Sequence, residues 1–122
     1  MGKNQSPEHD AQVALVDLIQ TVAPDILFTA TVGGVRLSMN QAKRMKAAGY
    51  LRGVPDLLFF EPRDGCLGLA IELKAKKGGR VSPDQRRVLD ELDARGWRTE
   101  VAHGYDHALH ILRDYFEELA DI

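Results

Sequence analysis

The most apolar part of the chain carries three charged residues whose spacing could support metal-dependent chemistry. Asp56 follows Pro55 at the start of the apolar run DLLFF, and the proline holds Val54 extended, which fixes where the run begins. Glu72 and Lys74 lie two residues apart in CLGLAIELKAK, so they share one face if this segment is a strand. The short turn PRDG between the two runs favours their pairing, which would bring Asp56 close to Glu72.

Two carboxylates at close range repel each other unless a cation lies between them. Hard oxygen donors that leave room for water favour Mg²⁺ or Mn²⁺. Beside such an ion, Lys74 could orient the attacking water or stabilise the charge that builds on a phosphate. Each motif alone is weak evidence, because an E-x-K pair is more often a solvated ion pair and a P-D pair more often a turn. Their joint occurrence favours a metal site.

Charge is distributed unevenly along the chain. The formal net charge is −2, yet residues 36–87 hold twelve Lys and Arg against five Asp and Glu, which gives +7, while the remainder carries −9. Such asymmetry is typical of a domain that turns a basic face toward a polyanion, although cations scattered over solvated helices are the simpler alternative. Few aromatic residues lie among the cations, which favours duplex or branched DNA over single strands. The candidate phosphate contacts are Arg36, Lys43, Arg44, Lys46, Arg52, Lys76, Lys77, Arg80, Arg86 and Arg87.

The hydrophobic pattern predicts the elements that must position these residues. Helices are expected over 7–23, 39–48, 83–95 and 106–119, and strands over 25–32, 56–60, 66–76 and 97–103, with a break at Gly33-Gly34. The order α-β-α-β-β-α-β-α predicts an α/β fold with a mixed β-sheet flanked by helices. Alternation over 66–76 predicts one core face and one polar face. The core face would hold Leu67, Leu69, Ile71 and Leu73, and the polar face Ala70, Glu72, Lys74 and Lys76.

Length and composition limit the class of protein. A chain of 122 residues is expected to form one domain over 1–122 with a core of its own. Apolar residues make up 44% and charged residues 28%, which argues against a disordered or fibrous protein. No apolar run approaches the ~18 residues that a membrane span needs. With the single cysteine, Cys66, these features predict a cytoplasmic protein that does not associate with a membrane.

The P-D and E-x-K motifs resemble the signature of the PD-(D/E)XK nuclease superfamily. More narrowly, GGVRLSMNQAKRMKAAGYLRGVPDLLF and AIELKAKKGGRVSPDQRRVLDELDARGW resemble the VRR-NUC branch, including its small stand-alone phage and bacterial members. The resemblance extends from Glu8 to the last predicted strand, implies a restriction-endonuclease-like fold, and allows a phage or prophage origin. It implies Asp56, Glu72 and the backbone carbonyl of Leu73 as metal ligands, with Lys74, Gln85 and Glu8 completing the catalytic set.

Two of these assignments have simpler alternatives. Gln85 completes a capping box with Ser82, in which its side chain returns to the Ser82 amide. Glu8 lies in a first helical turn, where the helix dipole stabilises any acid by ~0.3–1 kcal/mol.

The resemblance implies a Mg²⁺- or Mn²⁺-dependent DNA endonuclease, a phosphodiester hydrolase selective for branched DNA such as the Holliday junctions of DNA repair. It also implies a homodimer, since a junction needs two symmetric cuts and a small domain has one site. Two alternatives stay open: a DNA-binding module of the same fold that does not cut, and a metal enzyme acting on a small phosphoester.

Overall fold

The computed structural model describes residues 6–32 and 36–122, and the predicted break at Gly33-Gly34 lies outside them. Its elements follow the predicted order, and the mixed sheet flanked by helices confirms the predicted α/β class. The elements are α1 (Pro7–Val22), β1 (Phe28–Ala30), α2 (Met39–Ala47), β2 (Leu57–Phe59), β3 (Leu69–Lys74), α3 (Pro83–Ala94), β4 (Arg98–His103), α4 (Tyr105–Tyr115) and the 3-10 helix η2 (Glu117–Leu119).

Serine side chains fix where three of the helices begin. Ser6 accepts a hydrogen bond from the backbone amide of His9 and so caps α1. Ser38 before α2 and Ser82 before α3 each form a complete capping box with the glutamine three residues later. A capping side chain satisfies amide groups that have no partner inside the helix, typically for about 1 kcal/mol. These local signals explain why the starts of the helices could be predicted.

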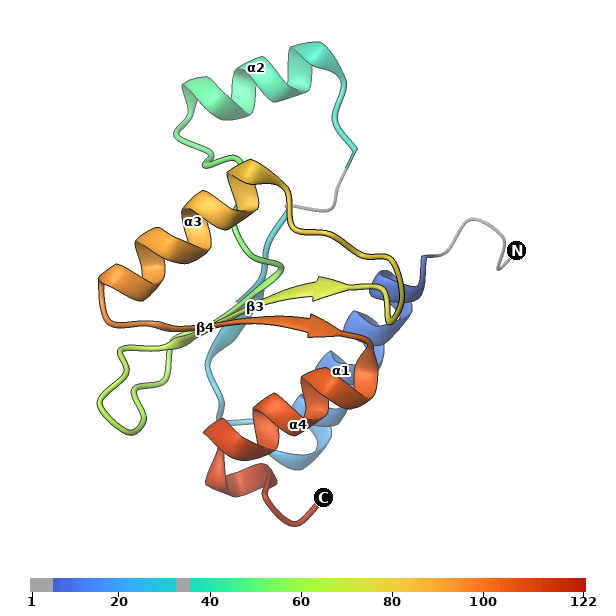
Figure 1. Cartoon of the computed structure of the whole chain (residues 1–122), viewed down its shortest axis with the longest axis vertical. Coiled ribbons are helices and arrows are strands. Elements are labelled where there is room, and N and C mark those ends of the chain that lie inside the picture. The colour runs from blue at the N-terminus through green and yellow to red at the C-terminus, as the bar shows by residue number, and fades with distance from the viewer. Residues whose placement is uncertain (1–5, 33–35) are drawn as a thin grey trace.

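The sheet has the order β1-β2-β3-β4 (Figure 1). β1 pairs with β2, and β2 with β3, in antiparallel orientation, whereas β3 and β4 are parallel. A tight turn, closed by the bridge between Arg63 and Cys66, joins β2 to β3 as a hairpin. Parallel neighbours need a long crossover, and α3 is that crossover between β3 and β4.

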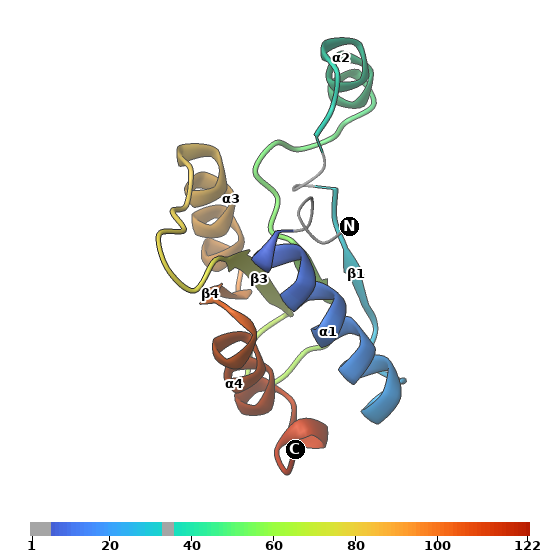
Figure 2. The ribbon, with the colours of Figure 1, turned by 90° about the vertical axis from the view of Figure 1, so that its right-hand side faces the viewer.

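The main core lies between the sheet and the helices α1 and α4. Leu15 and Ile19 of α1 and Leu112 of α4 are fully buried in one cluster with Phe59 and Ile71 of the sheet. β4 runs between α3 and α4 in both views of the ribbon (Figures 1 and 2). Helices therefore cover both faces of the sheet at β3 and β4, with the larger apolar cluster on the α1 and α4 side.

The prediction of a polar face on the strand after the hairpin was wrong. Ala70 is fully buried and Glu72 is only 3% exposed, because α3 packs over this side of the strand and buries Val88 and Leu89 there. Leu67, expected in the core, is 59% exposed and precedes β3. The strand is shorter than predicted and is buried on both faces, as parallel neighbours usually are.

Other predicted boundaries were too long. The strand expected over 25–32 is limited to β1, and the strand expected over 56–60 begins one residue after Asp56. The final helix ends at Tyr115, because Phe116 adopts extended backbone angles of φ −111° and ψ 112°. Phe116 is fully buried, and its ring lies 5.5 Å from that of Phe59. Packing of this side chain decides the break, and η2 follows it.

Helix α2 differs from the other helices. It stands away from the sheet in both views (Figures 1 and 2), and none of its nine residues is buried. Most of its side chains are polar or basic, and Arg44 and Lys46 lie in its last turn. Lys43, Arg44 and Lys46, here termed the α2 cations, are all exposed.

Candidate functional site

The antiparallel register of β2 and β3 brings the two predicted acids face to face. Leu57 pairs with Ile71, so the next residue pair along the same register is Asp56 and Glu72. Residues directly opposite in an antiparallel pair have Cβ atoms ~4.5–5.5 Å apart and point to the same side. The expectation that strand pairing would bring Asp56 close to Glu72 is therefore met.

Pro55 changes the hydrogen bonding where β2 begins. By the register, the fully buried Pro55 lies opposite Leu73, but a proline has no N–H to donate to the Leu73 carbonyl. The Leu73 amide donates to Oδ2 of Asp56 at 2.7 Å rather than to the Pro55 carbonyl opposite it. The carbonyl of Pro55 accepts from Oγ1 of Thr31 at 2.7 Å, which ties β1 to the same point. The hydrogen bonding between β2 and β3 is therefore interrupted at Pro55, and at this point the Leu73 amide binds the Asp56 carboxylate.

Glu72 is a buried acid with one unsatisfied oxygen. Oε2 accepts a hydrogen bond from Nε2 of Gln85 at 3.0 Å and lies 3.5 Å from Nζ of Lys74. Oε1 is buried and has no hydrogen-bond partner among residues 6–32 and 36–122. Burial, together with the nearby Asp56, raises the pKa of Glu72 from 4.5 to about 8, while Lys74 opposes the shift.

Asp56 responds to the same surroundings. Burial raises the pKa of its carboxyl above the usual value, while the Leu73 amide, Glu72 and Lys74 lower it and Glu8 raises it. The two acids therefore titrate as a pair, and a protonated Glu72 can donate a hydrogen bond to Asp56. Burial and the closeness of the two acids therefore favour a proton on this pair when no cation is bound.

Gln85 joins the acid to the lysine. Its Oε1 accepts from Nζ of Lys74 at 2.9 Å and also from the amide of Ser82 at 2.8 Å, while its Nε2 donates to Glu72. The capping role and the site contact, which compete in the sequence, are both present because one oxygen serves Ser82 and Lys74 together. The Lys74 side chain is only 14% exposed, so these contacts fix its ammonium group at the site.

A cavity of about 370 Å³ lies in front of these groups. The first turn of α1 lines this cavity. In the ribbon this turn lies beside the end of β3 (Figure 2). Its lining includes all five side chains that the sequence predicted as catalytic, namely Glu8, Asp56, Glu72, Lys74 and Gln85. The structure thus brings together residues from α1, β3, α3 and the turn before β2.

The cavity also has lining residues that the sequence analysis missed. Ser6, the N-cap of α1, borders it with His9 and Gln12 of α1, and Thr31 borders it just after β1. Gln12 could have been found, because it follows Glu8 by four residues and so lies on the same helix face. Thr31 gives no such signal in the sequence, since its place at the site depends on the pairing of β1 with β2.

The donor set suits a small divalent cation only with help from the backbone and water. Within the described part of the chain, no three His, Cys, Asp or Glu side chains cluster as a metal site. Asp56 and Glu72 offer two carboxylates, and the carbonyl of Leu73 points the same way as its amide, toward β2 and Asp56. Three oxygen donors with open positions match the preference of Mg²⁺ and Mn²⁺ for oxygen ligands and retained water.

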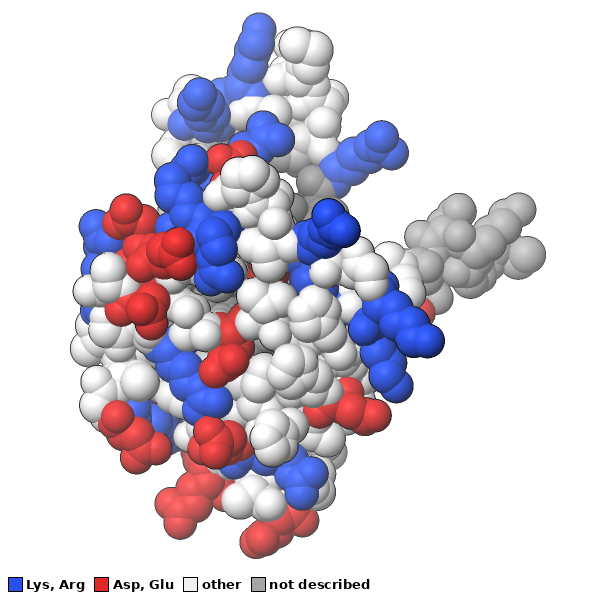
Figure 3. Space-filling model, in the orientation of Figure 1, with Lys and Arg blue, Asp and Glu red and all other residues white. Residues whose placement is uncertain are grey.

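All ten predicted phosphate contacts are exposed. In Figure 3, Lys and Arg side chains gather toward the α2 end of the molecule, and acidic side chains gather over the outer side of α3 and the opposite end. Three of the ten are engaged in ion pairs, Arg52 and Arg87 with Asp84 and Arg86 with Asp90. The ten residues are distributed over four parts of the chain. Arg36 and the α2 cations lie before and on α2, Arg52 lies between α2 and β2, Lys76, Lys77 and Arg80 lie between β3 and α3, and Arg86 and Arg87 lie on α3.

Fold and site together define a class of protein: a mixed α/β domain that gathers two carboxylates, a lysine and a glutamine at one cavity. The VRR-NUC domain matches residues 11–106, so the chain belongs to the VRR-NUC family of nuclease-type domains. The match includes every predicted site residue except Glu8. No individually curated protein matches the chain.

A solved structure described as a VRR_NUC domain protein has the same fold. It superimposes with a TM-score of 0.75 at 22% sequence identity, over 93% of this chain and 90% of its own. No helix within residues 6–32 and 36–122 has the length and hydropathy needed to cross a bilayer.

Proposed function

We propose that this protein is a divalent-metal-dependent DNA endonuclease of the PD-(D/E)XK type, which hydrolyses phosphodiester bonds. The observation that carries the proposal is Glu72, a buried acid that faces Asp56 and has an oxygen without a hydrogen-bond partner in the described structure. Burying such a group is costly unless a partner compensates for it. A cation held between the two acids would supply that partner, and membership of a nuclease-type family supports this interpretation.

Mg²⁺ or Mn²⁺ fits the donors, which would be the carboxylates of Asp56 and Glu72 and the carbonyl of Leu73. Such an ion supplies an activated water nucleophile and neutralises charge that develops on the phosphate. The side chains around it hold the geometry. Because Asp56 and Glu72 are mounted on paired strands, their separation is fixed before any ligand arrives.

Lys74 and Gln85 act next to the two acids. Gln85 holds Nζ of Lys74 at 2.9 Å, which aims the ammonium group into the cavity where a phosphate oxygen would gain negative charge. Fixed charges of this kind stabilise a transition state without having to reorganise. Glu8 borders the same cavity and would support the site through its negative charge.

DNA is the substrate that best explains the exposed cations. Phosphate contacts by the α2 cations and by the exposed Lys and Arg after β3 would provide affinity that does not depend on base sequence. A small phosphoester would leave this surface without a role. The preferred substrate would be branched DNA such as a Holliday junction, and a homodimer would place two cavities for two symmetric cuts. A cytoplasmic location and a phage or prophage origin are parts of the same proposal.

The test is cleavage of a labelled four-way junction and of a matched linear duplex, with Mg²⁺, with Mn²⁺ and with chelator. The wild type is compared with Glu72→Ala and with the control Glu117→Ala, which changes an exposed residue of η2. We expect metal-dependent cutting by the wild type and the control, and no cutting by Glu72→Ala with its circular dichroism spectrum retained. Equal cutting by Glu72→Ala would refute the assigned role.

Two further outcomes separate the alternatives. Salt-dependent DNA binding without cutting, for the wild type with either metal, would favour the DNA-binding module. Phosphoester hydrolysis without salt-sensitive DNA affinity would favour the small-molecule enzyme. Sedimentation with and without junction DNA tests the homodimer, and equal cutting of linear duplex by a monomer would overturn the branched-DNA part of the proposal.

A further inference from the structure

The turn that leads into Asp56 presses directly on the helix that carries Gln85. Gly53 lies three residues before Asp56 and has a φ of +90°, a conformation that L side chains rarely adopt. A Cβ at this position would lie 2.5 Å from the carbonyl carbon and oxygen of Asp84 and 2.9 Å from the amide nitrogen of Gln85. The backbone of the turn therefore rests against the first turn of α3.

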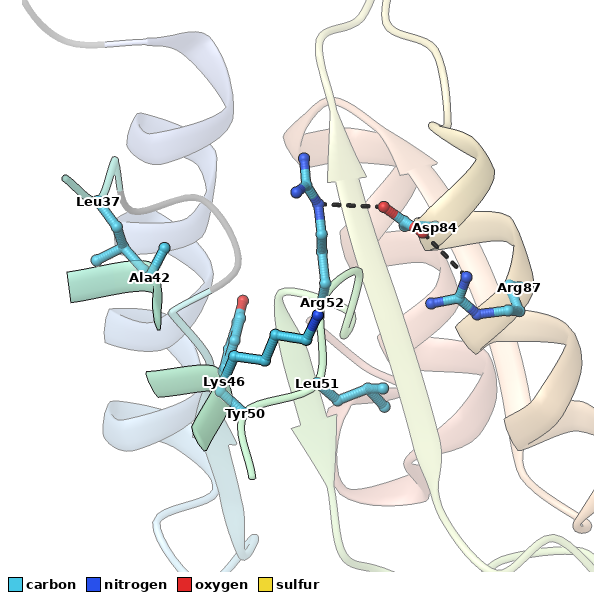
Figure 4. A pocket seen from close by; sticks show the side chains of 8 residues that line it. All are labelled: Leu37, Ala42, Lys46, Tyr50, Leu51, Arg52, Asp84 and Arg87. Carbon is cyan, nitrogen blue, oxygen red and sulfur yellow. Dashed lines mark hydrogen bonds and ion pairs between the residues drawn. The ribbon is translucent and has the colours of Figure 1, made fainter. Parts of the chain in front are cut away.

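Two ion pairs to Asp84 reinforce this backbone contact. Nε of Arg52 lies 3.1 Å from Oδ2 of Asp84, and a guanidinium nitrogen of Arg87 lies 3.0 Å from Oδ1 of the same carboxylate. Arg52, Asp84 and Arg87 line a hollow of about 610 Å³. Figure 4 shows the ion pairs that join the two arginines to Asp84. Exposed ion pairs each contribute ~0–1 kcal/mol, so the backbone contact at Gly53 is the main constraint.

This contact sets the relation between two parts of the site that the sheet does not link directly. Asp56 is placed by the turn before β2, whereas Gln85 is placed by α3, which arrives after β3. We propose that Gly53, with Arg52, is a positioning residue that seats α3 so that the Gln85 amide lies between Glu72 and Lys74. The role in catalysis that this implies depends on the proposed nuclease function.

Two constraints require a glycine at position 53: its positive φ, and the close approach of the α3 backbone, which leaves no room for a Cβ. An added methyl group would have to move from 2.5 Å to at least the 3.4 Å of an ordinary contact, and the neighbour it meets is backbone. The first turn of α3 must therefore shift. The hydrogen bonds of Gln85 to Glu72 and Lys74, at 3.0 and 2.9 Å, leave little room for such a shift.

Gly53→Ala tests the proposal, and Gly49→Ala is its matched control. Gly49 has a similar φ of +101°, but nothing lies within 4 Å of the place its methyl group would take, so this variant bears the backbone strain without the contact. The first readout is the side-chain amide signals of Gln85 in ¹⁵N NMR spectra of the metal-free protein. We expect them to shift toward those of a solvated glutamine in Gly53→Ala and to stay in place in Gly49→Ala. Unchanged signals in a folded Gly53→Ala protein would overturn the proposal.

Cleavage kinetics provide the second readout. Misplacement of a supporting group by ~1 Å can lower a rate by ~10²-fold, so we expect kcat to fall at least ~10-fold in Gly53→Ala while KM for DNA stays the same. Combining Gly53→Ala with Gln85→Ala should be no slower than Gln85→Ala alone, because both act through one group. Multiplying effects would contradict the proposal. If the wild type does not cut DNA, the NMR result still decides the positioning role, so the two proposals can fail separately.

Arg52→Ala guards against a Gly53→Ala protein that does not fold. It removes an 86% exposed side chain and the ion pair to Asp84 but keeps the glycine. Because this ion pair is the weaker of the two constraints, we expect the Gln85 amide signals to shift in Arg52→Ala in the same direction as in Gly53→Ala but by less, and such a shift would support the proposal. If Gly53→Ala unfolds and Arg52→Ala leaves these signals at their wild-type positions, the proposal is overturned.

Discussion

Glu72→Gln should make the metal-free protein more stable at pH 8 while leaving its stability near pH 5 almost unchanged. Glutamine has the shape of a protonated glutamate and cannot ionise. Its amide can donate to Asp56, and its oxygen can still accept from Gln85, so the contacts of the protonated acid are kept. The substitution therefore isolates the cost of the buried charge.

The sign and size follow from the pKa of Glu72. Burial raises that pKa from 4.5 to about 8, so the folded state binds more protons than the unfolded state between these pH values. The contribution of protonated Glu72 to the free energy of unfolding is therefore fully present below about pH 4.5, and it falls as the pH rises toward 8. At ~1.4 kcal/mol per pH unit, the interval from 4.5 to about 8 amounts to about 5 kcal/mol, and because Asp56 shares the titration we expect about 3 kcal/mol from Glu72 alone.

Urea unfolding of the wild type and of Glu72→Gln, in chelator at pH 5 and at pH 8, measures this difference. Glu117→Gln, at an exposed position of η2, is the control and should change the free energy of unfolding by less than about 0.5 kcal/mol at either pH. A Glu72→Gln protein that is no more stable than the wild type at pH 8 would refute the reasoning. So would a gain of the same size at both pH values.

Three further predictions concern the metal, the glutamine and the basic helix. Mg²⁺ at about 100 times its dissociation constant should raise the free energy of unfolding of the wild type by about 2.7 kcal/mol, and much less in Glu72→Gln, as thermal melts at several Mg²⁺ concentrations would show. Gln85→Glu keeps a capping side chain but replaces the donor to Glu72 with a further acid beside Asp56 and Glu72, so cleavage should fall at least ~10-fold. Ser82→Ala should instead cost about 1 kcal/mol of stability and leave the cleavage rate within about twofold of the wild type, and the opposite pattern would make Gln85 a cap only. Alanine at all three α2 cations should reduce the magnitude of the slope of log affinity against log salt concentration by about 2–3, as measured by fluorescence anisotropy with duplex DNA. An unchanged slope would show that α2 does not contact DNA phosphates.

Local patterns made the elements and the facing acids predictable. Capping side chains, apolar periodicity and the short hairpin turn act between residues close in sequence, so they can be read without knowing the fold. The hairpin turn between the two runs led us to expect that Asp56 would approach Glu72. The structure adds the register that pairs them, together with the hydrogen bond from Leu73 to Asp56.

The environment of Glu72 could not be predicted in this way. Alternation along the strand correctly placed Glu72 and Lys74 on one face, but it assigned that face to solvent. The face is buried because the chain must cross the sheet between the parallel strands β3 and β4, and the helix of this crossover, α3, packs on the face that carries Glu72. Burial under this helix, together with the neighbouring Asp56, raises the pKa of Glu72 to about 8.

The sequence by itself thus determined which residues could form a site and on which elements they would lie, because strand periodicity, turn length and helix caps are local. Only the tertiary structure decided how those residues meet. It buried Glu72, let one oxygen of Gln85 serve both Ser82 and Lys74, and seated α3 on Gly53. These contacts join separate elements of the fold, and their geometry depends on how a helix packs on the sheet, which no local pattern encodes.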